Sequence, residues 1–176
     1  MGEIRSSLSK ISLDYSYYFF LIGDYEINTP INSFFNDNFK KIGSDIGENA
    51  VIVRRTDKSR IERELNDIYT NISINTDLNK IAKFFKKAFE HENKPGLLIM
   101  NRHPSQLLVD SKIAYISFAA LEKTYPDKNE LLRDIVGLAQ NNDYTIFKKT
   151  ATKRKIVDGI SISINLGVLS INFDLK

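Results

Sequence analysis

The stretch PGLLIMNRHPS, residues 95–105, decides how the rest of the chain is interpreted. A Pro-Gly turn pair precedes four large apolar residues at 97–100, and polar residues begin at Asn101. An apolar run without alternation, bounded by turn signals, is typical of a β-strand that is covered on both faces. The stretch therefore predicts a buried strand over 97–101 that ends in a polar loop, and loops at strand ends often carry function.

The composition of the chain indicates a globular protein with one hydrophobic core. Of its 176 residues 42% are hydrophobic, which favours a single domain over residues 1–176. The chain contains no cysteine, which excludes disulfides, thiolate catalysis and zinc-thiolate sites and is compatible with the reducing cytoplasm. Residues 1–12 are polar and rich in serine, and we expect them to be flexible.

Charge and hydropathy argue against a membrane protein and do not by themselves identify a ligand. The formal net charge is +3, which is too small to indicate a polyanionic partner. The longest apolar run near the N-terminus, residues 15–22, is well short of the ~20 residues that span a bilayer. No cleavage site of a signal peptide follows it. We therefore predict a cytoplasmic protein without a membrane partner.

The remaining apolar patterns predict an α+β fold. Asn28-Thr29-Pro30 is typical of a capped helix start, and Gly43 is the expected helix stop. Further helices are predicted from a capping box at Ser59 to Glu62, from Leu78 to Phe89, and after Pro126-Asp127. The predicted fold is a mixed β-sheet with about four helices and a C-terminal antiparallel hairpin. Its predicted strands outside the hairpin are 15–22, 50–54, 97–101, 113–118 and 144–148.

The C-terminal residues predict a β-hairpin. Apolar residues alternate with small polar ones from Ile160 to Leu166, and the phase of the alternation reverses before Leu169 to Leu175. The small polar face would allow close approach by a protein partner or by a second copy of the chain. The same pattern fits a half-buried hairpin that covers the core, and also the apolar/polar alternation of a pore-forming hairpin.

The polar loop after the central strand is the first candidate ligand site. Arg102 offers a planar fork of donors for phosphate or carboxylate, and His103 titrates near neutral pH. Asn101 and Ser105 have side chains that can orient a ligand. At the carboxyl end of a parallel strand, such a loop would lie where open α/β sheets bind ligands. The alternative is a hydrated surface turn.

A basic segment near residue 150 is the second candidate. Between Tyr144 and Val157 there are five cations and no acidic residue. They would contact phosphates of a nucleic acid or another polyanion, with Tyr144 and Phe147 available for stacking. The alternative is a solvated edge that opposes aggregation between strands. The cations are Lys148, Lys149, Lys153, Arg154 and Lys155.

Motifs of known enzyme classes are missing from the sequence. The two histidines, His91 and His103, do not form HxxxH or HExxH spacing, and no GxxxxGK[ST], GxGxxG or GxSxG pattern is present. We therefore predict neither a metal site nor a cofactor. The favoured function is a non-catalytic binding or regulatory module that recognises a protein partner or an anionic ligand. The alternative is a small metal-independent ribonuclease or phosphoryl-transfer enzyme that uses His103 and Arg102.

The polyanion hypothesis predicts a defined salt dependence. If all five cations of the basic segment neutralise phosphates, log K against log salt should have a slope of about −4 to −5. Titration of labelled RNA and DNA at several salt concentrations measures this slope. Binding that does not respond to salt would contradict the hypothesis.

Overall fold

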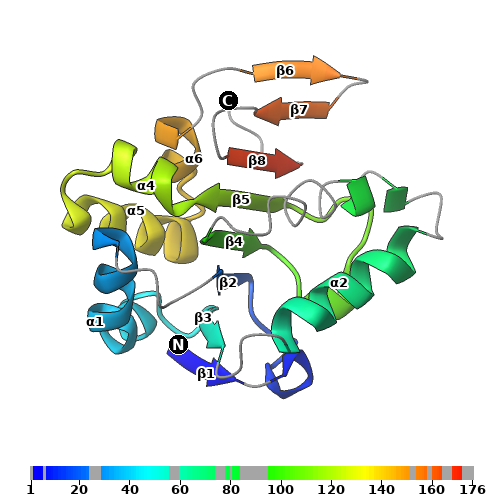
Figure 1. The fold of residues 1–176 in the computed structure, drawn as a ribbon, viewed down its shortest axis with the longest axis horizontal. Coiled ribbons are helices and arrows are strands. Elements are labelled where there is room, and N and C mark those ends of the chain that lie inside the picture. The colour runs from blue at the N-terminus through cyan, green and yellow to red at the C-terminus, as the bar shows by residue number, and fades with distance from the viewer. Residues whose placement is uncertain are drawn as a thin grey trace.

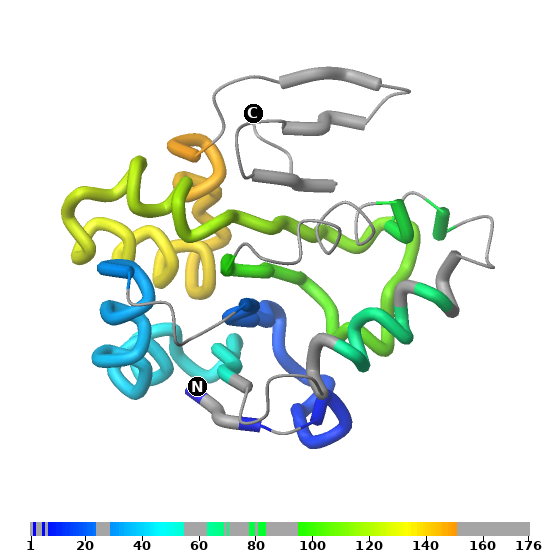
Figure 2. Tube along the Cα trace, viewed as in Figure 1, coloured from blue at the N-terminus to red at the C-terminus, as the bar shows by residue number. Residues whose placement is uncertain are grey.

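The structure, a computed structural model, describes residues 2–5, 7–23, 29–55, 60–73, 78–79, 81–83 and 95–150, and the backbone of 154–157, 160–163 and 168–171. The longest uninterrupted described stretch, 95–150, runs from the central strand to the last helix (Figure 2). His91, Lys153, Ser59 and most of the helix predicted at 78–89 lie outside the described residues.

A six-stranded mixed sheet forms the centre of the fold, which confirms the predicted α+β class. β1, β3 and β2 are parallel to one another, whereas β4, β5 and β8 are each antiparallel to the preceding strand in the sheet. The order of strands is β1 (Gly2–Arg5), β3 (Ala50–Arg55), β2 (Tyr17–Ile22), β4 (Gly96–Met100), β5 (Ile113–Ser117) and β8 (Val168–Ile171). The loop after β4 would lie at a typical ligand position only if β4 were a parallel strand, and this condition is not met, because both neighbours of β4 run antiparallel to it.

The central strand is covered on both faces, as its sequence predicted. Leu97 and Ile99 belong to one hydrophobic core, and Leu98 and Met100 belong to a second core on the opposite face. β2 divides its side chains between the two cores in the same way. A strand with two buried faces has no solvated side, which explains the lack of polar alternation in both apolar runs.

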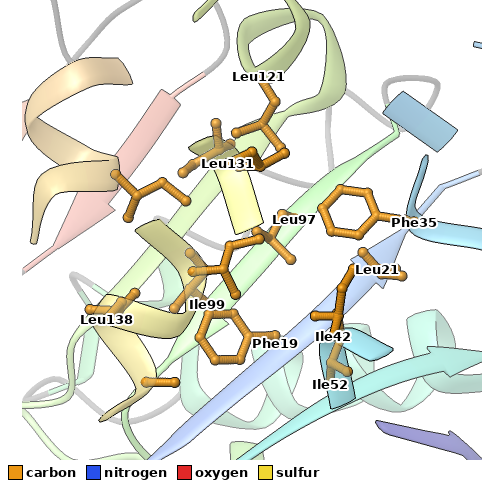
Figure 3. Close-up of a cluster of buried hydrophobic side chains, with 14 of the residues drawn as sticks. Phe19, Leu21, Phe35, Ile42, Ile52, Leu97, Ile99, Leu121, Leu131 and Leu138 are labelled. Carbon is orange, nitrogen blue, oxygen red and sulfur yellow. The ribbon is translucent and has the colours of Figure 1, made fainter. Parts of the chain in front are cut away.

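Different helices cover the two faces of the sheet (Figure 1). The first core lies between the sheet and α1 (Pro30–Asp45), α4 (Phe118–Thr124), α5 (Lys128–Asn141) and α6 (Thr145–Thr150). In Figure 3, Phe35 of α1 lies next to Leu97 and Leu21 of the sheet, whereas Ile42 of α1 and Leu138 of α5 lie on either side of Phe19. On the opposite face, Leu65 of α2 (Arg60–Ser73) belongs to the second core.

Helix α1 begins where the sequence predicted and ends later. The side chain of Thr29 accepts a hydrogen bond from the backbone of Asn32 at 3.3 Å, and Pro30 occupies the first turn. Gly43 does not end the helix but is buried inside it. A Cβ atom on Gly2 of β1 would lie 3.1 Å from the Cα atom of Gly43, so the two glycines let β1 approach α1 closely. The turn follows at Gly47, whose φ is +81°.

The strand predicted at 144–148 is wrong, because residues 145–148 belong to helix α6 (Thr145–Thr150) and Tyr144 lies in the turn before it. Asn142 ends α5 in the left-handed conformation, with φ 54°. The carboxylate of Asp143 then accepts hydrogen bonds from the backbone and the hydroxyl of Thr145, at 3.0 and 2.6 Å. A capped start thus overrides the strand propensity of a short apolar run, which periodicity alone does not separate from a helix.

The N-terminal segment is packed at residues where we expected flexibility. After β1, a short 3-10 helix, η1 (Leu8–Lys10), buries Leu8, and Ile11 follows it into the second core. The carboxylate of Glu64 on α2 accepts hydrogen bonds from the Ser7 hydroxyl at 2.8 Å and the Leu8 backbone at 2.6 Å. These contacts fix residues 7–11 against α2.

The turn of the predicted C-terminal hairpin lies outside the described residues. β7 (Ile160–Ser163) pairs antiparallel with β6 (Arg154–Val157), and β8 pairs with β5 of the central sheet. Pairing of 160–166 with 169–175 therefore stays a prediction.

Substituting Gly96 in the central strand should destabilise the protein. A Cβ atom at this position would lie 2.5 Å from the ring of Tyr115 on β5. We expect Gly96→Ala to lower the free energy of unfolding by ~1–3 kcal/mol, the usual cost of overpacking a core. Urea denaturation measures this change.

A Tyr115→Leu background is the control for this prediction. The cost of Gly96→Ala should shrink there, because the ring that the methyl group meets is removed. An equal cost in both backgrounds would contradict steric overlap as the cause.

Candidate functional site

The loop that connects β4 to β5, residues 101–112, is the candidate site, and its ends are tied together by Asn101. The Asn101 side-chain oxygen accepts a hydrogen bond from the Lys112 backbone at 2.7 Å, and the Asn101 backbone donates to the Lys112 oxygen at 3.1 Å. Asn101 therefore closes the 101–112 loop. Because its side-chain oxygen accepts this bond, the ligand contact that the sequence predicts for Asn101 would have to come from the amide nitrogen.

His103 points into the protein. It is only 3% exposed, and the edge of its ring faces Tyr18 with 5.5 Å between the centroids. Nδ1 lies 2.7 Å from the Ser105 hydroxyl and 3.2 Å from the Ser105 backbone nitrogen, and Nε2 lies 3.2 Å from the Leu8 oxygen. Burial lowers the pKa of His103, and the hydrogen bond to Leu8 opposes this shift. His103 and Ser105 therefore start the 3-10 helix η3 (Pro104–Gln106) and fix the loop to the N-terminal segment.

Arg102 lies at the surface of the 101–112 loop. Its guanidinium forms an ion pair with Asp110 at 3.0 Å, and the side chains of Arg102 and Asp110 are 37% and 71% exposed. The pair connects the two arms of the loop. An exposed pair of this kind contributes about 0–1 kcal/mol, so both side chains can exchange partners at low cost.

The tip of the 101–112 loop exposes two apolar side chains. Leu108 is 51% exposed and Val109 is 59% exposed. Beneath them, the buried Ser111 accepts a hydrogen bond from the Leu108 backbone on its hydroxyl at 2.8 Å and donates its own N–H to the Leu108 oxygen at 3.0 Å. Buried Leu107 joins the second core. The tip is thus held from below, and its apolar side chains face outward.

The predicted basic segment is divided by the structure. Lys148 is exposed on α6, whereas Lys149 turns toward α5 and contacts Glu130 at 2.6 Å and Asp134 at 2.8 Å. The hydrogen bonds that Lys149 donates to Asp134, and then to Glu130, raise its pKa. Arg154 and Lys155 lie in β6, of which the structure describes the backbone. The ammonium of Lys149 is therefore neutralised within the protein, and the predicted five-cation surface loses one member.

A buried acidic group that sequence reasoning missed accounts for the orientation of Lys149. The Asp134 side chain is 6% exposed, and its Oδ2 accepts hydrogen bonds from Lys149 and from the Tyr125 hydroxyl, the latter at 2.9 Å. Burial, followed by the hydrogen bond to Asp134, raises the pKa of Tyr125. The sequence feature that could have indicated this buried group is the position of Asp134 next to the apolar stripe of α5, between Leu131 and Leu138.

A second polar cluster joins the 101–112 loop to the start of α6. The Lys112 ammonium lies 3.2 Å from the Tyr144 hydroxyl and 5.2 Å from the centre of the same ring. The buried Tyr17 donates its hydroxyl to the Asn142 side chain at 2.7 Å, and burial, followed by interaction with Tyr144, raises the pKa of Tyr17. The loop and α6 therefore meet through Lys112, which was not predicted as a site residue, and Tyr144, which the sequence suggested only as a stacking residue.

In the described segments, no group of three or more histidine, cysteine or acidic side chains is arranged to hold a metal ion. Nor does any helix in those segments have the length and apolarity to cross a membrane. No protein-family model, curated protein or solved structure matches this chain.

The Tyr125–Asp134 hydrogen bond should stabilise the protein measurably. A hydrogen bond to a buried charged group contributes ~1.5–3 kcal/mol, so Tyr125→Phe should lower the free energy of unfolding by about that amount. In the Asp134→Asn background, the same substitution should cost ~1 kcal/mol less, because the charged acceptor is gone. Urea denaturation of the four proteins of this double-mutant cycle measures the difference.

The exposed ion pair between Lys41 and Asp45, at 2.9 Å, provides the control. Lys41→Ala should change the stability by no more than ~0.5 kcal/mol. No coupling between Tyr125 and Asp134 would contradict a stabilising network.

Proposed function

We propose that the protein is a non-catalytic binding module that recognises a protein partner through the tip of the 101–112 loop. The observation that carries this proposal is the exposure of Leu108 and Val109, at 51% and 59%, on a loop whose backbone is fixed by hydrogen bonds. Apolar anchors on a preorganised loop bind with little loss of conformational entropy. Removing their apolar surface from water would contribute free energy to binding.

The polar residues around the tip suit the rim of such an interface. The ion pair of Arg102 and Asp110 lies beside the apolar tip and is solvent-exposed. Each side chain can therefore pair with an opposite charge on the partner while Leu108 and Val109 enter an apolar pocket. This combination favours a protein partner over a purely anionic ligand, because Lys149 already pairs with two carboxylates.

The alternative of a ribonuclease or phosphoryl-transfer enzyme has less support. A general acid or base must contact the proton that it transfers, and both ring nitrogens of His103 contact groups of the protein itself. Arg102 retains an exposed guanidinium that can contact phosphate. Incubation of the protein with labelled RNA and DNA, with and without EDTA, tests this alternative. Cleavage that His103→Ala abolishes would replace our proposal.

A double substitution at the tip tests the proposed binding function. We expect the immobilised protein to retain a partner from a lysate of its source cells, and Leu108→Ser with Val109→Ser to reduce that retention at least about tenfold. The loss follows from the removal of both apolar anchors. The affinity of the isolated partner for both proteins is then measured by titration calorimetry.

Leu13→Ser is the matched control, because Leu13 is also an exposed apolar residue, at 49%. It should leave the affinity unchanged. If the partner is a second copy of the chain, sedimentation velocity should show a dimer that the double substitution dissociates. A partner that binds equally well to the double variant would contradict the proposal.

A further inference from the structure

The hydrogen bonds of His103 define one tautomer of its ring. The backbone N–H of Ser105 can only donate, so Nδ1, 3.2 Å away, must accept. The proton of the neutral ring is then on Nε2, which donates it to the backbone oxygen of Leu8 at 3.2 Å. The Ser105 hydroxyl, 2.7 Å from Nδ1, can rotate to donate as well. The site is therefore built for the neutral imidazole.

Leu8, whose backbone oxygen contacts His103, belongs to a segment that forms hydrogen bonds with both the 101–112 loop and α2. Leu8 accepts the proton of His103 on its oxygen, and its backbone nitrogen donates to Glu64 of α2 at 2.6 Å. The Ser7 hydroxyl donates to the same carboxylate at 2.8 Å. η1 thus depends on one carboxylate and one imidazole, together with the burial of Leu8 and Ile11.

A second proton on His103 would disrupt this arrangement. It would have to bind at Nδ1, where it would face the N–H of Ser105, so that contact would change from attractive to repulsive. The Ser105 hydroxyl, 2.7 Å away, could turn to accept the new proton, but this would not remove the cost of burying the charge. The charge would also lie at a position that is only 3% exposed. We propose that His103 is a pH-sensitive latch, which holds residues 7–11 against the 101–112 loop while neutral and releases them when protonated.

The titratable and charged groups on the elements packed around His103 do not supply a compensating contact. Tyr18 of β2 presents its ring to the histidine at 5.5 Å, and Tyr15 packs on Tyr18 at 5.8 Å. Glu64 is engaged with Ser7 and Leu8. The other described groups of this kind on η1, before β2, on α2 and in the loop are Lys10, Asp14, Arg63, Asp67, Arg102, Asp110 and Lys112.

The direction of the pH effect follows from linkage. Burial lowers the pKa of His103 in the latched state, whereas the released side chain has the ordinary value of about 6.5. Release is therefore accompanied by proton uptake. The latch is complete above about pH 6.5, and the equilibrium constant for release rises at most about tenfold for each pH unit below it. An ordinary carboxylate titrates about two units lower, so a transition above pH 5 belongs to the imidazole.

A spin label on η1 tests the latch in the full chain. Because the chain has no cysteine, Ser9→Cys at an exposed position of η1 accepts one nitroxide. We expect its mobile fraction to increase between pH 7.5 and 5.5, by at most about tenfold, as measured by electron paramagnetic resonance. A nitroxide at Lys123→Cys, exposed on α4, should not respond. A simultaneous response at both positions would indicate global unfolding and overturn the proposal.

Two histidine variants assign the response. His103→Gln should abolish the pH dependence of the label on η1, and His91→Gln should retain it. Retention of the pH dependence in His103→Gln would overturn the proposal. Nitrogen-15 spectra of the unmodified protein at pH 7.5 give a measurement that needs no substitution: they should show His103 protonated on Nε2, and protonation on Nδ1 would overturn the latch.

Discussion

The burial of both faces of β2 and β4 is the constraint on which the rest of the structure depends. Phe19 and Ile99 require a cover on one side of the sheet, and Phe20 and Leu98 require one on the other. α1, α4, α5 and α6 provide the first cover. The second combines α2 with η1 and the buried residue Leu107 of the 101–112 loop. A loop and an N-terminal segment thereby become parts of the core, although their sequences are mostly polar.

The same constraint determines what the polar residues do. At the edges of the two cores, titratable side chains form hydrogen bonds and ion pairs that connect one element of the protein to another. His103 contacts the Leu8 backbone, and Asp134 contacts Tyr125 and Lys149, so both of these buried side chains have partners within the protein. Buried polar groups that are fully paired make a packing arrangement specific, whereas an unpaired one is costly. The apolar side chains of Leu108 and Val109 are the opposite case, since they remain exposed where burial would be favourable.

The sequence predicted the elements whose patterns are local. β2, β3, β4 and β5, the start of α1 at Thr29 and that of α5 at Asp127 all follow from apolar runs and capping residues. It did not predict α6, because Asp143 decides between strand and helix through a single cap. Nor could it show that His103 contacts Leu8, since that contact spans 95 positions in the chain and depends on sheet topology. Arg102, His103 and Ser105 were correctly placed after the central strand, but the linear pattern does not show which of them faces inward.

The position of β1 has a consequence for the order in which the sheet assembles. Its partner among the described strands is β3, with Gly2 opposite Ile52, so β1 can pair only after a strand about fifty positions further along the chain has been made. β2 and β3 are joined through α1 and can pair before β1 does. The entropy lost on closing a loop increases with the length of the loop, so contacts between distant residues form at a higher entropic cost than local contacts. We therefore expect β1 to pair with β3 late in folding, after β2 and β3 have paired.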